Sequence, residues 1–206
     1  MATSQLTHPI NMRNQARAAA LWCDGWYRCA KAEPSPNFER RPAGSIVDLV
    51  VIHSISLPPG DFRNGNVQKL FLNQLDWDAH PYFDAIRGLK VSAHFFISRT
   101  GELLQFVSCD YRAWHAGQSS YYGRSDCNNY SVGIELEGLE GGLFEAAQYE
   151  TLSTLGAAIL ANYPIRHVAG HEDIAGGRKS DPGAGFDWAY IAKSLGLNSD
   201  RLPQRL

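Results

Sequence analysis

The run IVDLVVIH at residues 46–53 constrains the fold of this chain more than any other stretch. It is almost continuously apolar and rich in β-branched residues, and the Pro- and Gly-rich segment SLPPGDFRNGN follows closely. Such a run is typical of a strand that is buried on both faces in the middle of a sheet. A chain of 206 residues is long enough to cover both faces of that sheet within one domain.

The remaining patterns predict the elements around this strand. Further strands are expected over residues 90–98, 103–108, 130–138 and 168–170, the first two joined as a hairpin. Helices are expected over residues 67–75, 146–163 and 187–196, and the last has Asp187 as N-cap and Gly196 as its stop. The expected fold class is α/β, with a mixed central β-sheet flanked by helices.

Composition and the ends of the chain exclude several classes of function. The net charge of −2 gives no basic field for nucleic acid, and no apolar run approaches the roughly 20 residues of a membrane span. We interpret residues 1–24 as an N-terminal extension before a single domain at 25–206. The apolar stretch at 18–22 is too short for a signal sequence, so we expect a cytoplasmic protein. The four cysteines form no CxxC pair and are expected to be free thiols, and no obligate protein partner is predicted.

Three residues from distant segments form a candidate metal site. His53 ends the predicted central strand, and ligands of open α/β sheets gather at the carboxyl ends of strands. His171 follows the short strand at 168–170, and the Gly-rich loop after it brings Asp181 back toward it. Two imidazoles and one carboxylate are a recognised ligand set for catalytic zinc. The alternative is a strand-end histidine that bonds a loop carbonyl, beside an ordinary polar loop.

Other polar residues favour a reaction at the same place, each with a structural alternative. Glu135 and Glu137 share one face of an otherwise apolar strand, and a carboxylate beside a metal can act as a general base. The alternative is a half-exposed strand with a solvated face. Lys179 lies two residues before Asp181 and can stabilise an oxyanion, or can be an exposed loop lysine. Trp114 and His115 of RAWHAG can contact a sugar, or can be a core tryptophan beside a surface histidine.

Six segments resemble, in order, the zinc N-acetylmuramoyl-L-alanine amidase family. They are LVVIHSISLPPGDF, HPYFDAI, VSAHFFISRTGELLQFV, RAWHAG, CNNYSVGIELEG and GHEDIAGGRKSDPGAGFDW. The similarity covers most of the chain, from about residue 25 to 188, and is greatest to the cytosolic 1,6-anhydro branch of the family.

The resemblance implies a fold, a cofactor and a reaction. The fold is the mixed sheet shared with peptidoglycan recognition proteins. One Zn²⁺ per chain is implied, with His53, His171 and Asp181 as ligands, Glu135 as catalytic base and Lys179 as transition-state stabiliser. The implied substrate is an anhydromuropeptide of cell-wall recycling, cut between the lactyl group of 1,6-anhydro-N-acetylmuramic acid and L-alanine. In this family, loss of that activity is linked to β-lactamase induction.

The chain also departs from the family pattern. Gly176 stands where relatives carry proline, so we expect a looser ligand loop. Ser54 replaces a common asparagine, and Lys90 offers a cation for a peptide carboxylate. Ser54, Tyr82, Lys90, Trp114 and His115 are therefore the predicted substrate contacts. Two alternatives stay open: an exported amidase that acts on polymeric peptidoglycan, and a peptidoglycan-binding module without catalysis.

Overall fold

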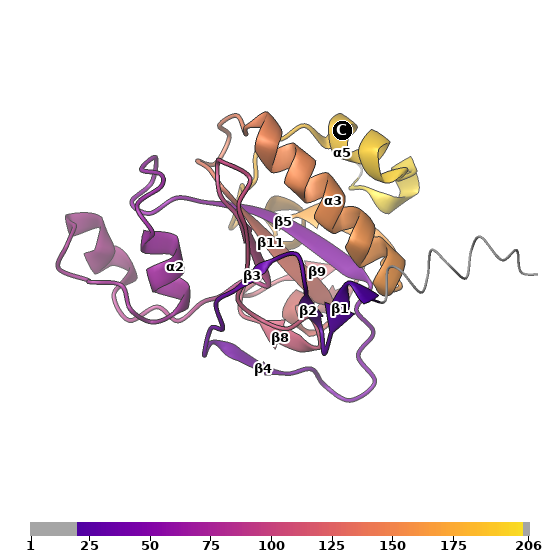
Figure 1. The fold of residues 1–206 in the computed structure, drawn as a ribbon, viewed down its shortest axis with the longest axis horizontal. Coiled ribbons are helices and arrows are strands. Elements are labelled where there is room, and N and C mark those ends of the chain that lie inside the picture. The colour runs from indigo at the N-terminus through magenta and orange to yellow at the C-terminus, as the bar shows by residue number, and fades with distance from the viewer. Residues whose placement is uncertain (1–19, 204–206) are drawn as a thin grey trace, which may run out of the picture.

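A six-stranded mixed sheet forms the centre of the computed structural model, which describes residues 20–203 (Figure 1). Its strand order is β12-β5-β11-β6-β7-β3, and only β6 and β7 pair antiparallel. The strands are β3 (Lys31–Ala32), β5 (Leu49–Ile55), β6 (Phe95–Ile97), β7 (Leu103–Gln105), β11 (Ser131–Glu137) and β12 (His167–Gly170). Both long strands, β5 and β11, lie inside the sheet, as their apolar sequences require.

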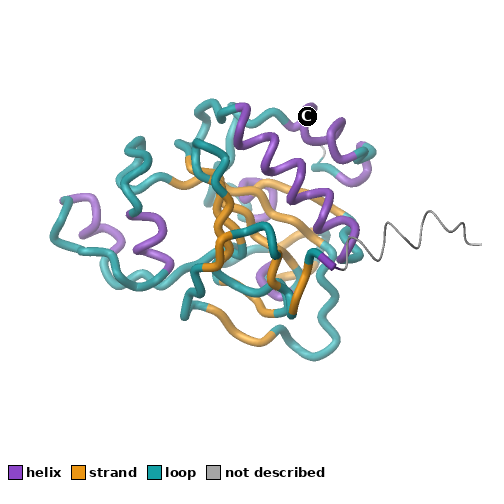
Figure 2. Tube along the Cα trace, viewed as in Figure 1, coloured by secondary structure: helices purple, strands orange, loops and turns teal. Residues whose placement is uncertain are grey.

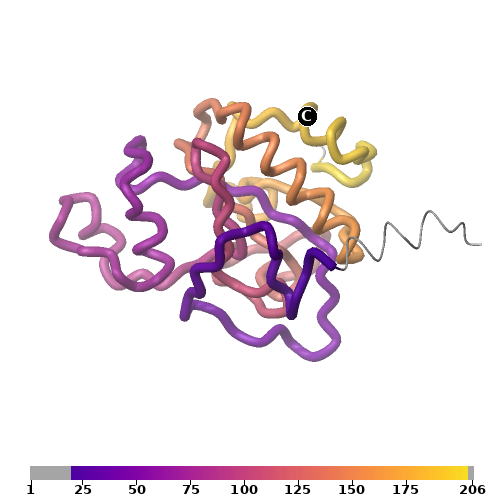
Figure 3. The backbone as a smooth tube through the Cα atoms, viewed as in Figure 1, coloured from indigo at the N-terminus to yellow at the C-terminus, as the bar shows by residue number. Residues whose placement is uncertain are grey.

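Helices cover one face of this sheet. The α3 helix (Ala146–Asn162) crosses it, and the yellow α5 helix (Trp188–Leu195) lies beside the orange α3 (Figure 3). Val50 and Ile52 of β5 pack in the same core cluster as Leu155 of α3 and Ile191 of α5. Side chains alternate along a strand, so the neighbours of Val50 and Ile52, including His53, point to the opposite face.

The opposite face is covered by short helices and loops. The α2 helix (Asn66–Phe71) packs Leu70 and Phe71 with Phe96 and Phe106. The lobe around α2 consists of loops and short helices, including the 3-10 helix η1 (Pro81–Ile86) (Figure 2). Further short elements are the 3-10 helices η2 (Cys127–Asn129) and η3 (Ser199–Arg201), and α4 (His171–Ile174). The paired strands are β1 (Trp22–Cys23) with β2 (Trp26–Tyr27), β4 (Phe38–Arg40) with β8 (Tyr111–Ala113), and β9 (Ser120–Tyr121) with β10 (Arg124–Ser125).

The predicted elements exist, but several boundaries were wrong. The central strand runs two residues past His53, to Ile55, because Gly138 still donates a backbone hydrogen bond to Ile55 there. The strand expected over 90–98 shortens to Phe95–Ile97. The helix expected over 67–75 ends at Phe71, and Asn73 beyond it is in the left-handed region with φ of 58°. The last helix is confirmed with Asp187 and Gly196 as its caps.

Three further expectations concern the N-terminal extension, the cysteines and membrane-spanning segments. Most of the proposed extension, residues 1–19, lies outside the described residues, whereas Trp22 packs in the core against Tyr27, Phe95 and Tyr163. The four cysteines are free, as predicted. Within residues 20–203, no helix has the length and apolar character needed to cross a bilayer.

Candidate active site

Register in the sheet brings the first functional groups together. The parallel pairing of β5 and β11 places Glu135 directly beside His53, and both point away from α3. On the other side of β5, Gly170 of β12 pairs with Ile52, so His171 follows at the same edge. His171 is the first residue of α4, and its neighbour Glu172 donates its amide to the carbonyl of Asp181 at 2.9 Å. The loop between α4 and Asp181, called the ligand loop below, therefore returns to the carboxyl ends of the strands.

His53, His171 and Asp181 converge in the folded chain, as predicted, and are all buried. The two Nδ1 atoms lie 3.0 Å apart, and an Asp181 carboxylate oxygen lies 3.2 Å from each. Ligand atoms about 2.0–2.1 Å from a tetrahedral zinc are separated by about 3.3 Å along the edge of the tetrahedron. The spacing of these three groups fits one such ion.

Hydrogen bonds on the far side of each ring fix which nitrogen faces the cluster. His171 Nε2 lies 3.2 Å from the carbonyl of Ala116, which can only accept, so Nε2 carries the proton. Ser131 donates its hydroxyl to the carbonyl of Cys127 and so accepts from His115 Nε2 at 3.1 Å. His115 Nδ1 is then an acceptor for His53 Nε2, 2.9 Å away.

The Nδ1 atoms of His53 and His171, which face the cluster, therefore carry lone pairs, and both rings are neutral. Two lone pairs 3.0 Å apart beside a carboxylate repel one another, and a cation between them removes that repulsion. Burial, together with the neighbouring His171 ring, lowers the pKa of His53 to about 4 although Asp181 opposes the shift. Burial acts to raise the pKa of Asp181, but the adjacent His171 and His53 rings hold it below its usual range. Neutral imidazole and ionised carboxylate are the forms that bind a divalent metal.

Glu135 is the one buried carboxylate of the site without a full set of partners among the described residues. Its Oε2 atom is buried and has no hydrogen-bond partner in this part of the chain. Burial raises the pKa of Glu135 well above its usual range, the Asp181 charge raises it further and the Lys179 ammonium opposes both. A carboxylate held this way is suited to take a proton from water.

Glu137, two residues along β11, has a different role. Its carboxylate accepts the backbone amides of Arg63 and Arg99, and its own carbonyl accepts from Gln148. The solvated polar face that the sequence left open for this strand is absent, because both glutamates are buried. Glu137 joins two loops to the sheet, whereas Glu135 keeps a buried oxygen without a partner among the described residues.

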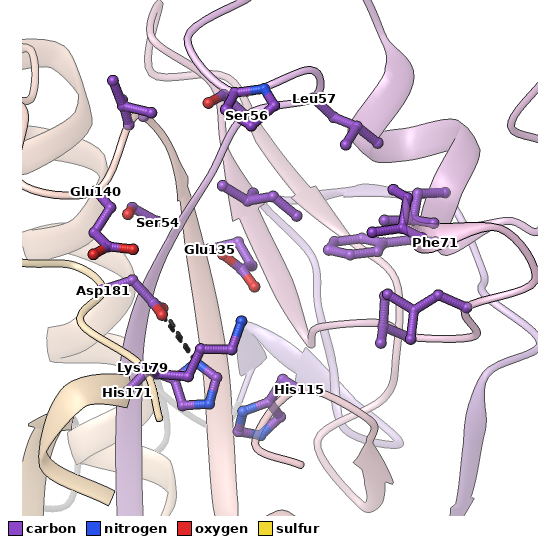
Figure 4. A pocket seen from close by; sticks show the side chains of 18 of the residues that line it. Ser54, Ser56, Leu57, Phe71, His115, Glu135, Glu140, His171, Lys179 and Asp181 are labelled. Atoms are coloured by element: carbon purple, nitrogen blue, oxygen red, sulfur yellow. Dashed lines mark hydrogen bonds and ion pairs between the residues drawn. The ribbon is translucent and has the colours of Figure 1, made fainter. Parts of the chain in front are cut away.

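A cavity of about 300 Å³ opens beside these groups (Figure 4). Glu135, Lys179, Asp181 and His171 lie at one side, and Phe71 and Leu57 lie opposite. Lys179 is exposed in its loop and still lines the cavity, so the i, i+2 spacing with Asp181 places both at the site. The cavity thus joins a polar reaction side to an apolar wall.

Four of the five predicted substrate contacts line this cavity. They are Ser54, Tyr82, Trp114 and His115. Lys90 does not: it is exposed, and only its neighbours Leu89 and Val91 contribute to the lining. His115 is buried and bonded to His53, so its ring supports a metal-facing histidine besides touching the cavity.

Sequence reasoning missed several supporting residues. Arg178 donates to the carbonyls of Ala116 and Gln118 and so fastens the ligand loop to the RAWHAG segment. Glu140 lines the cavity and accepts a hydrogen bond from Ser180. The RK pair before Asp181 gave a signal for Arg178, whereas no spacing pattern marks Glu140.

Comparisons with known proteins agree with this geometry. The profile of the N-acetylmuramoyl-L-alanine amidase family matches residues 43–184. The 1,6-anhydro-N-acetylmuramyl-L-alanine amidases AmpD of Citrobacter freundii and Escherichia coli K12 are each 47% identical to the chain. These alignments cover 81% and 80% of this chain, and 90% and 91% of the two relatives.

Solved structures show the same fold. A crystal structure of a Se-Met AmpD derivative superposes with a TM-score of 0.83 at 46% identity and covers 85% of this chain and 99% of that chain. AmiD from E. coli, in complex with the substrate anhydro-N-acetylmuramic acid-L-Ala-D-gamma-Glu-L-Lys, gives a TM-score of 0.55 at 27% identity. That match covers 76% of this chain and 61% of that chain. A human PGRP-IBETAC complex, 16% identical with a TM-score of 0.52, shares the fold, as expected. With the family profile spanning residues 43–184 and relatives at 47% identity matched over most of their length, this chain belongs to the N-acetylmuramoyl-L-alanine amidase family.

Proposed function

We propose that this protein is a zinc-dependent amidase of cell-wall recycling. Its substrate is a muropeptide, and the bond cut joins the lactyl group of 1,6-anhydro-N-acetylmuramic acid to the L-alanine of the stem peptide. The observation that carries the proposal is the convergence of two imidazole lone pairs and one carboxylate beside a buried oxygen of Glu135 that has no partner within residues 20–203. The identity of 47% to amidases named for this substrate supports the choice of bond.

The residues of the chain divide the reaction among them. His53, His171 and Asp181 would hold one zinc ion, which when bound would supply Lewis acidity for the carbonyl and lower the pKa of water. Glu135 accepts a proton from the attacking water as oxygen adds to the lactyl carbonyl carbon. Lys179 donates to the oxygen that gains negative charge. Glu135 then passes its proton to the alanine nitrogen, and the C–N bond breaks.

The cavity supplies the means to bind a substrate that is both sugar and peptide. Trp114 and Tyr82 offer aromatic faces, and Ser54 offers a buried hydroxyl without a partner among the described residues. A buried unpaired hydroxyl favours a ligand that hydrogen-bonds it. The solved complexes of AmiD and of AmpDh3 from Pseudomonas aeruginosa, the latter with anhydromuramic pentapeptide, hold ligands of this class.

Mass spectrometry of reaction products tests the function directly. Zinc-loaded protein is incubated with anhydromuramyl-tripeptide and with its non-anhydro counterpart, and each reaction is repeated after chelation. We expect free tripeptide and anhydro-N-acetylmuramic acid, lost with chelator and restored by Zn²⁺. Absence of product from zinc-loaded protein would favour the binding-module alternative, and release that chelation leaves unchanged would reject the metal site.

We also propose a cytoplasmic location, as the similarity to recycling amidases suggests. Cell fractionation with detection of the native protein tests it. Recovery outside the cytoplasm, together with activity on polymeric peptidoglycan, would favour the exported-amidase alternative.

A further inference from the structure

We propose that Asn128 is a positioning residue for the metal centre, because its one side-chain oxygen holds the segment that orients both metal-facing imidazoles. The inference rests on the proposed metal site and extends it to a residue that belongs neither to the three-residue cluster nor to the cavity lining. Asn128 lies in η2, directly before β11.

Two consecutive residues, His115 and Ala116, supply the acceptors for the Nε2 atoms of His53 and His171. The His115 ring accepts from His53 Nε2 at 2.9 Å, and the Ala116 carbonyl accepts from His171 Nε2 at 3.2 Å. Both bonds force the lone pair of each ring onto Nδ1, toward the cluster. A shift of this single segment would therefore rotate or release both rings together.

Asn128 holds the backbone amides of this segment. Its Oδ1 atom accepts the amide of His115 at 3.2 Å and the amide of Ala116 at 2.9 Å. One oxygen thus serves two adjacent backbone donors, a role that a side chain without an acceptor cannot fill. Loss of that oxygen leaves two amides of a partly buried segment without their partner.

The backbone at Asn128 is itself held by a hydrogen bond from Arg41. The partly buried Arg41 guanidinium donates to the carbonyl of Asn128 at 3.0 Å and to the carbonyl of Ser131 at 2.8 Å. Ser131 closes the network, since its hydroxyl accepts from His115 and donates to Cys127. The amide oxygen of Asn128 is therefore presented from a fixed backbone.

The consequence is a measurable coupling between Asn128 and metal affinity. Residues that orient a ligating histidine from its far side typically change metal affinity 10–100-fold when they are mutated. Asn128 acts on two ligands through one segment, so we expect N128A to weaken zinc binding by at least tenfold.

The test compares zinc affinity in matched variants. Zinc dissociation constants are measured by competition with a chromophoric chelator for the parent protein, N128A, N128D and N129A. N128D keeps an acceptor oxygen and should retain most of the affinity. N129A removes the neighbouring amide, which accepts from Arg112 instead, and should bind zinc like the parent. In parallel, ¹⁵N spectra of the histidine rings should show Nε2-protonated His53 and His171 in the parent and loss of that single tautomer in N128A.

The outcomes separate this inference from the proposed function. If the parent binds no zinc, the proposed function fails. If the parent binds zinc and N128A binds within twofold of it with unchanged ring spectra, only the role of Asn128 is rejected. Near-UV circular dichroism of the apo proteins reports folding. If N128A does not fold, N128L is judged by the same criteria, since leucine fills the space without an acceptor. Failure of both to fold would assign Asn128 to folding and overturn the inference.

Discussion

Two glutamates two residues apart on one strand show how environment assigns chemistry to a single side chain. The oxygens of Glu137 accept the amides of Arg63 and Arg99, whereas Glu135 has a raised pKa and an oxygen with no partner in the described part of the chain. The sequence marks both as unusual on an apolar strand. Which of the two reacts depends on loop amides from residues 63 and 99, and no spacing rule predicts those contacts.

The raised pKa of Glu135 has opposite effects on activity and on stability. The folded protein holds this proton more tightly than the unfolded chain, so stability is lost as pH rises from about 4.3 through the raised pKa. E135Q removes the charge, and the metal-free variant at pH 7 should unfold at higher denaturant concentration than the metal-free parent.

The same variant should lose about 10²–10⁴-fold in turnover while it retains one zinc per chain. In the zinc-loaded parent, turnover should fall as pH decreases through the pKa of Glu135, because the base must be ionised. Denaturant titration, metal analysis and a pH–rate profile check these outcomes. Full activity in E135Q would remove Glu135 from the reaction.

Lys179 is expected to act on the transition state and not on metal binding. K179M keeps the length of the side chain and removes the ammonium that faces the cavity. We expect kcat to fall about 10²–10³-fold, as for loss of an oxyanion donor, with an almost unchanged zinc dissociation constant. Steady-state kinetics and chelator competition measure the two effects. A fall in zinc affinity without a fall in kcat at saturating zinc would assign Lys179 to the loop instead.

At the scale of elements, the long central strands could be predicted from the sequence, whereas the short paired strands around them could not. The apolar runs of β5 and β11 and the spacing of α3 identify the three elements that build the centre. The two- and three-residue strands such as β4 and β8 were not predicted, because pairs this short depend on tertiary partners and carry no periodicity. Convergence of His53 and Glu135 follows from parallel register, which only the folded sheet defines.

Gly133 of β11 leaves the space that the His115 ring occupies. A Cβ at position 133 would lie 2.5 Å from the His115 ring, so the ring occupies the space that a side chain would fill. G133A should therefore displace His115, destabilise the protein by about 1–3 kcal/mol and weaken zinc binding. Denaturant unfolding and chelator competition measure both effects. G123A is the control, because no described residue other than its chain neighbours lies within 4 Å of its Cβ position, although its positive φ adds strain.

The ligand loop between α4 and Asp181 contains Gly176 and Gly177, both in the left-handed region with φ of 55° and 79°. Proline fixes φ near −65° and cannot adopt this conformation. G176P, which restores the residue common in relatives, should therefore lower both the melting temperature and zinc affinity, and G176A should cost about 1–2 kcal/mol. Thermal denaturation with and without zinc tests this. A stabilised G176P would show that this loop can take the conformation expected for proline.

At the scale of the whole molecule, the proposed metal centre joins His53 and His171, which are 118 residues apart in the chain. An ion that binds only the folded state stabilises it, by about 2.7 kcal/mol at a free concentration 100 times its dissociation constant. For a chain of this size that corresponds to a rise in melting temperature of about 5–11 °C. Differential scanning calorimetry with zinc and with chelator measures the shift. The shift should vanish in D181A, because that variant removes the only charged ligand of the set.

The parallel pairing of β5 and β11 also bears on how this fold can diversify. The separation between His53 and Glu135 is fixed by two neighbouring central strands, while the apolar wall of the cavity comes from connections such as residues 55–59 and 82–91. Insertions or deletions in those connections leave the strand register unchanged. Loop exchange among related amidases should thus alter which glycans and peptides are accepted while hydrolysis is retained, so this scaffold is well suited to evolving or engineering new selectivity.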